Sequence, residues 1–182
     1  MCQPSQVEST VVTTTRWLDE EQQQAWRGWL DLNAQLSATL NRHLQTTSGL
    51  SLPDYDVLVA LTDVPERSLR MFELGRRLGW EKSRVSKQVS RMAVRGLVAR
   101  RESPDDRRGA LVNLTDAGLA AIQAAAPAHV ELVQRLVFDG LSRAQVRSLA
   151  SISATLLDRF DHLAATATTE LADARERSRS NR

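Results

Sequence analysis

Two observations predict a mainly helical fold with a small β-hairpin. Residues 80–115 read as a basic amphipathic helix followed by two short β-rich runs around a loop that carries Asp-Asp-Arg-Arg-Gly. Long segments on both sides of this unit repeat apolar residues at steps of three and four, which is the period of an α-helix. Together these patterns predict a winged helix-turn-helix flanked by long dimerisation helices.

The chain begins with a polar stretch and a long amphipathic segment. We expect residues 1–15, which are small and polar, to form a disordered tail. Residues 16–48 are predicted to form an N-terminal dimerisation helix, regular from Asp19 to His43 and ended by Gly49. Its apolar stripe consists of Trp26, Trp29, Leu30, Leu36, Leu40 and Leu44.

Residues 49–118 are predicted to form the winged helix-turn-helix domain. Ser51 has the features of an N-cap, because Pro53 follows in the first turn and the acid Asp54 lies three residues on. The helix that it opens ends near Pro65 and carries Tyr55, Leu58, Val59 and Leu61. A short helix over residues 71–78 and a turn at Gly79 then lead into the basic helix, which is the order of a helix-turn-helix.

The basic helix has two distinct faces. At about 100° per residue, Val85, Val89 and Met92 fall on one side, which we expect to be buried. The other side carries hydroxyl and cationic groups, which suit base edges and phosphate oxygens. An ordinary solvated helix face is the alternative. The candidate DNA-contacting residues of this helix are Lys82, Ser83, Arg84, Ser86, Lys87, Ser90 and Arg91.

A hairpin and two further helices complete the chain. Gly96 ends the basic helix, and residues 97–101 and 110–114 are predicted strands around a loop over residues 102–109. The candidate DNA-contacting residues of this wing are Asp106, Arg107 and Arg108. Residues 119–167 are predicted to form C-terminal dimerisation helices, one opened by Thr115 and running toward Phe138, the other opened by a capping box at Ser142. We expect residues 168–182 to form a disordered tail.

Charge is concentrated on the predicted reading unit. Residues 67–108 hold thirteen Lys and Arg against five Asp and Glu, a net charge of +8, whereas the whole chain carries +2. Such asymmetry attracts a polyanion to one lobe, and double-stranded DNA is the first candidate partner. No segment approaches the roughly 20 apolar residues of a membrane span, and the N-terminus lacks the pattern of a signal peptide, so we expect a soluble, cytoplasmic protein without a membrane partner.

Motifs for catalysis, cofactors and metals are missing from the sequence. It has no Gly-rich phosphate loop, no G-x-S-x-G and no H-E-x-x-H. The histidines His43, His129 and His162 have no second ligand at helical or turn spacing, and Cys2 is a single cysteine in the polar tail. We therefore expect no enzyme activity, no cofactor and no metal site.

The first and last predicted helices each carry a long apolar stripe, and the winged unit between them is too small to bury both stripes. A second copy of the chain is the expected cover, so that the terminal helices interleave in a two-fold homodimer. Intramolecular packing alone is the alternative. The candidate dimerisation residues are Trp26, Leu30, Val146, Leu149, Leu156 and Phe160.

The order of elements, with the wing phrase Asp106-Arg107-Arg108 and the sequence Leu114-Thr115-Asp116-x-Gly118, resembles the multiple-antibiotic-resistance regulator (MarR) family of transcription factors over about residues 19–164. The resemblance implies a homodimer that binds a near-palindromic, inverted-repeat operator and most often represses. It further implies that Arg108 enters the minor groove while Asp106 braces the wing, which agrees with the negative potential of a narrow groove.

The resemblance also suggests an effector. Many members of the family release DNA when a small aromatic acid binds between the dimer helices and the reading head, or when a cysteine is oxidised. The position of Cys2 in the tail disfavours thiol sensing, because a sensor thiol needs surroundings that lower its pKa. The candidates to line a cleft are Arg16, Trp17, Trp26, Trp29 and His43, although tryptophans at helical spacing usually belong to a core.

Two other functions remain open at this point. One is an architectural protein that binds DNA without strong sequence preference, and the other is a helical interaction module whose basic lobe docks an acidic protein partner. The short side chains of Ser83 and Ser90 beside Lys87 favour base reading, and an acidic partner would not require a basic wing tip.

Overall fold

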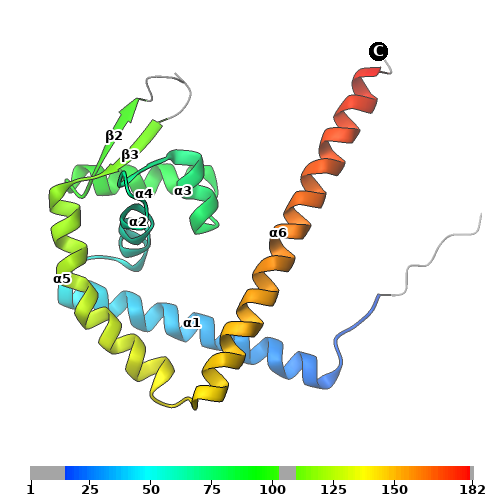
Figure 1. Cartoon of the computed structure of the whole chain (residues 1–182), viewed down its shortest axis with the longest axis horizontal. Helices are drawn as coiled ribbons and strands as arrows, with labels where there is room; N and C mark the ends of the chain where they lie inside the picture. The colour runs from blue at the N-terminus through cyan, green and yellow to red at the C-terminus, as the bar shows by residue number, and fades with distance from the viewer. Residues whose placement is uncertain (1–14, 103–109, 181–182) are drawn as a thin grey trace, which may run out of the picture.

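The computed structural model describes residues 15–102 and 110–180 (Figure 1). The elements are α1 (Glu20–Ser48), α2 (Leu52–Thr62), β1 (Ser68–Arg70), α3 (Met71–Leu78), α4 (Lys82–Val94), β2 (Val98–Glu102), β3 (Ala110–Leu114), α5 (Asp116–Val133), the π-helical turn η1 (Gln134–Phe138) and α6 (Arg143–Ser180). This order confirms the predicted fold class, a mainly helical chain with a small hairpin. The structure consists of a small head, formed by the segment from α2 to β3, and three long helical arms, α1, α5 and α6.

Local signals in the sequence set the ends of α1. The Asp19 carboxylate accepts a hydrogen bond from the backbone N–H of Gln22 at 2.8 Å, and the Gln22 side chain accepts one from the backbone N–H of Asp19 at 3.2 Å. At the other end Gly49 adopts φ 69°, a left-handed conformation that suits glycine and stops the helix. The predicted end at Gly49 is therefore confirmed.

The predicted caps of later helices are confirmed as well. The Ser51 hydroxyl accepts from the backbone N–H of Asp54 at 3.2 Å, and Asp54 returns a bond to the backbone N–H of Ser51 at 2.9 Å. Thr115 caps α5 by accepting from the backbone N–H of Gly118 at 3.0 Å. Ser142 opens α6 through reciprocal bonds with Gln145. Each motif satisfies backbone donors that a helix start leaves free.

The described residues contain a third strand that the sequence analysis did not predict. In the sheet order β1-β3-β2, both outer strands run antiparallel to β3, with Leu69 and Arg100 each opposite Val112. Arg67 precedes β1 with φ 48° and accepts a hydrogen bond from the backbone N–H of Leu114 at 2.9 Å. A strand of three residues has no periodicity of its own, so only the partner strand makes it recognisable.

The hydrophobic core lies in the head. Val85, Val89 and Met92 are completely buried, as the helical angle predicted. Leu44 from the end of α1 and Ile122 from α5 join the same cluster, so the arms are rooted in the head. The other completely buried aliphatic side chains are Val57, Leu58, Leu61, Leu74 and Val112.

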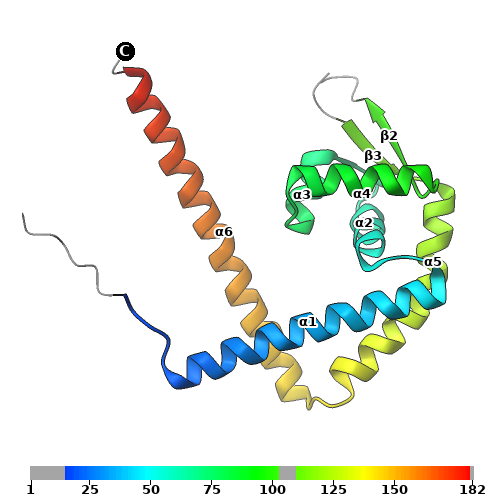
Figure 2. The same cartoon turned by 180° about the vertical axis from the view of Figure 1, so that it is seen from behind.

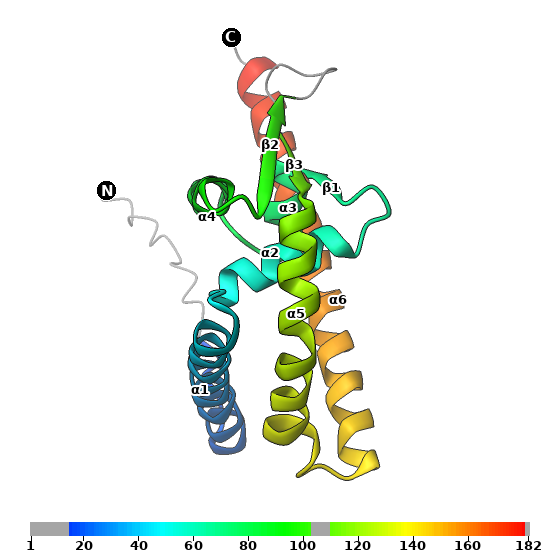
Figure 3. The same ribbon diagram turned by 90° about the vertical axis from the view of Figure 1, so that its left-hand side faces the viewer.

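The arms extend well beyond this core. Figures 1 and 2 show the first part of α1 and nearly all of α6 standing away from the head, and Figure 3 shows α1, α5 and the lower part of α6 pointing the same way below it. Trp26 and Trp29 are 53% and 42% exposed in the single chain, which differs from the usual burial of tryptophan in a core. The reason is that no element of the head reaches this stretch of α1.

One tail prediction needs correction. We expected disorder from residue 168, but α6 continues as helix to Ser180. Residues 168–180 are rich in Ala, Glu and Arg, whose high helix propensity outweighs the polar composition that suggested a tail. The predicted N-terminal tail, apart from Thr15, and Cys2 with it lie outside the described residues. In the described ranges, no helix is both long and apolar enough to cross a membrane.

Candidate nucleic-acid interface

A close turn joins α3 to α4. Gly79 adopts φ 62°, and the backbone N–H of Trp80 donates to the carbonyl of Gly75 at 2.8 Å. A Cβ on Gly75 would lie 3.1 Å from the Trp80 carbonyl oxygen and 3.3 Å from a methyl group of Val85. The absence of a side chain at Gly75 thus lets the turn at Trp80 and the start of α4 pack closely on α3.

The outer face of α4 carries the predicted set of polar side chains. Lys82, Ser83, Arg84, Lys87, Ser90 and Arg91 are all exposed, whereas Ser86 is half-buried. Ser86 lies nearer the edge of this face, beside the buried Val85 and Val89. The structure therefore places together the side chains that sequence reasoning selected, with the shortest ones leaving room for a close approach.

Arg84 is held at the start of this face by its neighbours. Its guanidinium lies 4.2 Å from the centroid of the Trp80 ring, in a cation–π contact. Burial raises the pKa of Asp56, and the positive charge of Arg84 acts in the opposite direction on the pKa of that carboxyl. Stacking restrains a long side chain and leaves its donors available on the surface.

A buried polar cluster behind α4 was missed by sequence reasoning. Asp54 and Gln88 are 3% and 2% exposed, and the Gln88 Nε2 donates to Asp54 Oδ1 at 2.6 Å. Arg95 forms an ion pair with Asp54 at 2.7 Å, and Arg91 donates to Gln88 Oε1. The capping pattern at Ser51 had already accounted for Asp54, and a glutamine usually faces solvent, so neither residue signalled a second role.

The base of the wing is built on Thr115. Its hydroxyl donates to the carbonyl oxygens of Gly96 and Leu97 at 2.7 and 2.9 Å while it caps α5. The start of α5 is thereby tied to the end of α4 and the start of β2. The predicted wing contacts Asp106, Arg107 and Arg108 lie outside the described residues.

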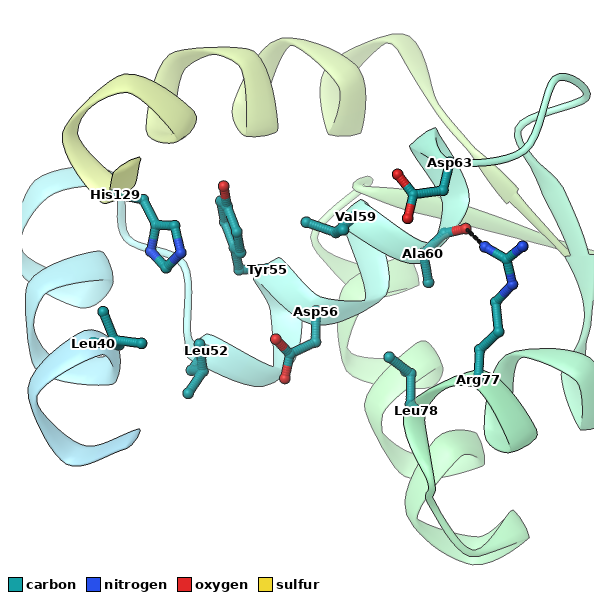
Figure 4. Close-up of a pocket in the computed structure, with 10 residues that line it drawn as sticks. All are labelled: Leu40, Leu52, Tyr55, Asp56, Val59, Ala60, Asp63, Arg77, Leu78 and His129. Atoms are coloured by element: carbon teal, nitrogen blue, oxygen red, sulfur yellow. Dashed lines mark hydrogen bonds between the residues drawn. The ribbon is translucent and has the colours of Figure 1, made fainter. Parts of the chain in front are cut away.

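A hollow of about 660 Å³ lies between the arms and the head. Figure 4 shows the Tyr55 and His129 rings side by side at its edge. Their ring centroids are 4.3 Å apart. Arg77 approaches from α3 and donates to the Ala60 carbonyl at 3.3 Å. The lining residues are Leu40, Leu52, Tyr55, Asp56, Val59, Ala60, Asp63, Arg77, Leu78 and His129.

Burial shifts the pKa values of His129 and Tyr55 at the edge of the hollow. It lowers the pKa of His129, and the nearby His43 lowers the pKa of His129 further. Burial likewise raises the pKa of the Tyr55 hydroxyl, with Asp56 adding to the rise. Among the described residues, His43 Nε2 and His129 Nδ1 are buried without a hydrogen-bond partner.

The residues that we predicted for a cleft do not line this hollow. Trp26 and Trp29 are exposed farther along α1, and Trp17 precedes that helix with 84% exposure. Arg16 is exposed beside Trp17, and His43 is outside the lining although it is close enough to influence His129. In the part of the chain that the structure describes, no group of three His, Cys, Asp or Glu side chains is arranged to hold a metal ion.

Known proteins share this architecture. The family model described as "MarR family" matches residues 48–109. The crystal structure of Sco3205, a MarR family transcriptional regulator from Streptomyces coelicolor in complex with DNA, is similar at 37% identity and a TM-score of 0.75, over 79% of this chain and 90% of that one. The chain matches no curated protein sequence.

Two further structures from Streptomyces coelicolor resemble the chain. AbsC, also a MarR family transcriptional regulator, has 35% identity and a TM-score of 0.74, covering 80% of this chain and 98% of that one. The transcriptional regulator PcaV, in complex with its natural ligand, has 26% identity and a TM-score of 0.60, covering 70% and 89%. The similarity thus extends over head and arms together.

Proposed function

Because the chain belongs to the MarR family of DNA-binding transcriptional regulators, we propose that it binds an inverted-repeat operator as a homodimer and represses transcription there. The observation that carries this proposal is the exposed face of α4, where Ser83, Lys87 and Ser90 stand beside cationic side chains on a head of net positive charge. Short hydroxyls next to cations can contact base edges as well as phosphates.

The uncovered arms support the dimer. Leu156 and Phe160 on α6 are 40% and 65% exposed, while Val146 and Leu149 on the same stripe are half-buried. Trp26 and Leu30 present a second apolar surface on α1. Exposed apolar area of this kind is covered in stable proteins, and a closed pair of identical chains is the commonest solution.

Selection of bound duplexes from random DNA at moderate salt tests the proposed function. In a two-fold dimer the two reading helices lie about 34 Å apart, so we expect a recovered inverted repeat with half-sites roughly 10 bp apart. Enrichment without a motif would instead support the architectural DNA binder. Failure to retain any duplex would favour the module that docks an acidic protein.

Lys87→Ala is expected to weaken operator binding, because Lys87 lies in the middle of the exposed face of α4. If Lys87 contacts phosphate, all duplexes lose affinity alike and the salt slope falls by about 2 per dimer. If it contacts a base, only the selected operator loses affinity, by about 1–3 kcal/mol per site. Fluorescence anisotropy at several salt concentrations separates the two cases. Arg135→Ala removes a charge away from the head and serves as the control, and an unchanged affinity for Lys87→Ala would contradict this orientation of α4.

We propose that Arg108 of the wing enters the minor groove, while Arg107 contacts phosphate and Asp106 braces the loop. A·T-rich flanks have a narrow groove with enhanced negative potential, so Arg108→Ala should lose more affinity on such flanks than on G·C-rich ones. Asp106→Ala should reproduce this pattern more weakly. Binding to paired duplexes that differ only in their flanks measures the effect, with Arg107→Ala as the matched control. Equal losses for Arg108→Ala on both duplexes would make Arg108 an ordinary phosphate contact.

We further propose that the hollow beside Tyr55 and His129 accepts a small aromatic effector that releases DNA. The adjacent rings offer a stacking surface at the junction of arms and head, where a ligand can change their relative position. The similar regulator PcaV is known with its natural ligand. Thermal-shift screening of aromatic acids against the protein and against Tyr55→Ala tests this, with a ligand-induced rise in melting temperature expected only for the unmodified protein. An equal rise in Tyr55→Ala would place the ligand elsewhere.

A further inference from the structure

The buried cluster of Asp54, Gln88 and Arg95 connects the reading helix to the root of the arms. Asp54 is the third residue of α2, and its carboxylate accepts from three donors: the Ser51 backbone N–H at 2.9 Å, Gln88 Nε2 at 2.6 Å and Arg95 Nη1 at 2.7 Å. Arg95 also donates to the carbonyl of Gly49, the cap of α1, at 2.8 Å. One carboxylate therefore joins the α1–α2 junction to Gln88 in the middle of α4 and to Arg95, the residue that caps the end of α4.

The cluster reaches the exposed face through a single amide. Gln88 and Arg91 in α4 and Arg95 at its C-cap lie three and four residues apart, so they follow one another along one side of the helix and its end. Gln88 donates inward to Asp54 and accepts outward from Arg91 Nη2. Arg91 is itself exposed and lies within the face that the proposed function assigns to DNA.

The chemistry of the carboxylate determines which way this amide points. An ionised carboxylate accepts hydrogen bonds and cannot donate them, so Asp54 must receive the NH₂ group of Gln88. The carbonyl oxygen of Gln88 is then directed toward α4's outer face, where it can receive a guanidinium donor. If the partner of Gln88 were a neutral amide instead of a carboxylate, the Gln88 side chain could point either way, because each amide can both donate and accept.

We propose that Asp54, acting through Gln88, is the positioning residue that orients Arg91 for DNA reading. This inference rests on the proposed function. A free arginine loses rotamer freedom when it binds DNA, and a side chain already held in place loses less. The cluster thus acts before DNA arrives, by restricting the directions in which Arg91 can reach the groove.

A double-mutant cycle tests the positioning. Affinity for the selected inverted-repeat duplex and for a scrambled duplex is measured for the unmodified protein, Gln88→Met, Arg91→Ala and the double variant. Methionine keeps the length of the buried side chain but neither donates inward nor accepts strongly from Arg91. We expect Gln88→Met to weaken operator binding by about fivefold and to have no further effect in the Arg91→Ala background. Independent losses, or an Arg91→Ala variant that binds as the unmodified protein does, would overturn the inference.

A matched control separates positioning from loss of stability. Val85→Ala removes buried apolar volume from the same helix without touching the hydrogen bonds, and Val85 is completely buried. The fold-losses of operator affinity caused by Val85→Ala and by Arg91→Ala should multiply in the variant that carries both. Those caused by Gln88→Met and by Arg91→Ala should not. If Val85→Ala also had no further effect on operator affinity in the Arg91→Ala background, any weakening of α4 would disturb Arg91. That result would overturn the specific role of Gln88.

A measurement on the unmodified protein covers the case in which Gln88→Met does not fold. In ¹⁵N NMR of the full chain without DNA, the Arg91 guanidinium signals are assigned by their loss in Arg91→Lys. In the unmodified protein these signals should show slowed rotation of the guanidinium group. In Asp54→Asn the rotation should be fast and the signals should average. Freely averaging Arg91 signals in the unmodified protein would overturn the inference. Failure of the proposed function looks different, because then the selection yields no inverted repeat while the guanidinium signals remain slowed.

Discussion

The variant that carries both Leu156→Asp and Phe160→Asp is expected to be a monomer and to lose operator binding by orders of magnitude. The two side chains are 40% and 65% exposed on α6 in the single chain, and a second copy would bury them. Four unpaired carboxylates per dimer would then have to enter an apolar contact, which costs several kcal/mol. Light scattering reports the oligomeric state, and anisotropy with the selected duplex reports binding.

The matched control for the dimer prediction carries the same new charges on the opposite face of α6. Ser151 and Ala154 are exposed and point away from the apolar stripe, so Ser151→Asp with Ala154→Asp should leave both the dimer and operator binding in place. If light scattering shows that the unmodified protein is already a monomer without DNA, the interpretation of the exposed stripe is wrong.

Gly118→Ala is expected to destabilise the head by about 3 kcal/mol or more, at the upper end of the range for inserting an extra group into a packed site. A Cβ on Gly118 would lie 2.1 Å from the Leu97 carbonyl oxygen and 2.9 Å from a methyl group of Leu114. The Leu97 carbonyl cannot simply move, because it accepts from the Thr115 hydroxyl at 2.9 Å. The start of α5 must therefore shift away from the base of the wing.

Urea unfolding followed by circular dichroism measures this loss at a fixed protein concentration. Gly140→Ala provides the comparison, since a Cβ there would meet no atom within 4 Å and the residue does not need positive φ. We expect Gly140→Ala to change stability by less than about 0.5 kcal/mol. Equal unfolding midpoints for the two variants would show that α5 adapts to a side chain at position 118 without cost.

Some features could be predicted because their causes lie within a few residues. The caps at Ser51, Thr115 and Ser142 depend on groups three residues apart, so the sequence displays both partners of each bond. The two faces of α4 follow from helical geometry, and Val85 and Met92 are buried as that geometry requires. The candidate DNA face was found by the same reasoning, since its members share one side of one helix.

Other features escaped prediction because their partners are distant in sequence. The strand β1 exists only through pairing such as that of Leu69 with Val112. The bond from Gln88 to Asp54 spans 34 residues, and hydropathy assigns both side chains to solvent. The hollow beside Tyr55 and His129 brings together segments from four helices, so the tryptophans of α1 were the wrong candidates for its lining.

By itself, the sequence determined the fold class, the end of α1, the starts of α2, α5 and α6, and the two faces of α4, because hydrogen-bonded caps and helical periodicity act over one or two turns. Only the tertiary structure decided that Asp54 serves α4 as well as α2, that Gly118 must remain without a side chain, and that the apolar stripes of the arms stay uncovered in one chain. These properties depend on which distant segments meet. Contacts of this kind arise when the core of the head closes around Leu58, Leu74 and Met92, and no local pattern encodes them.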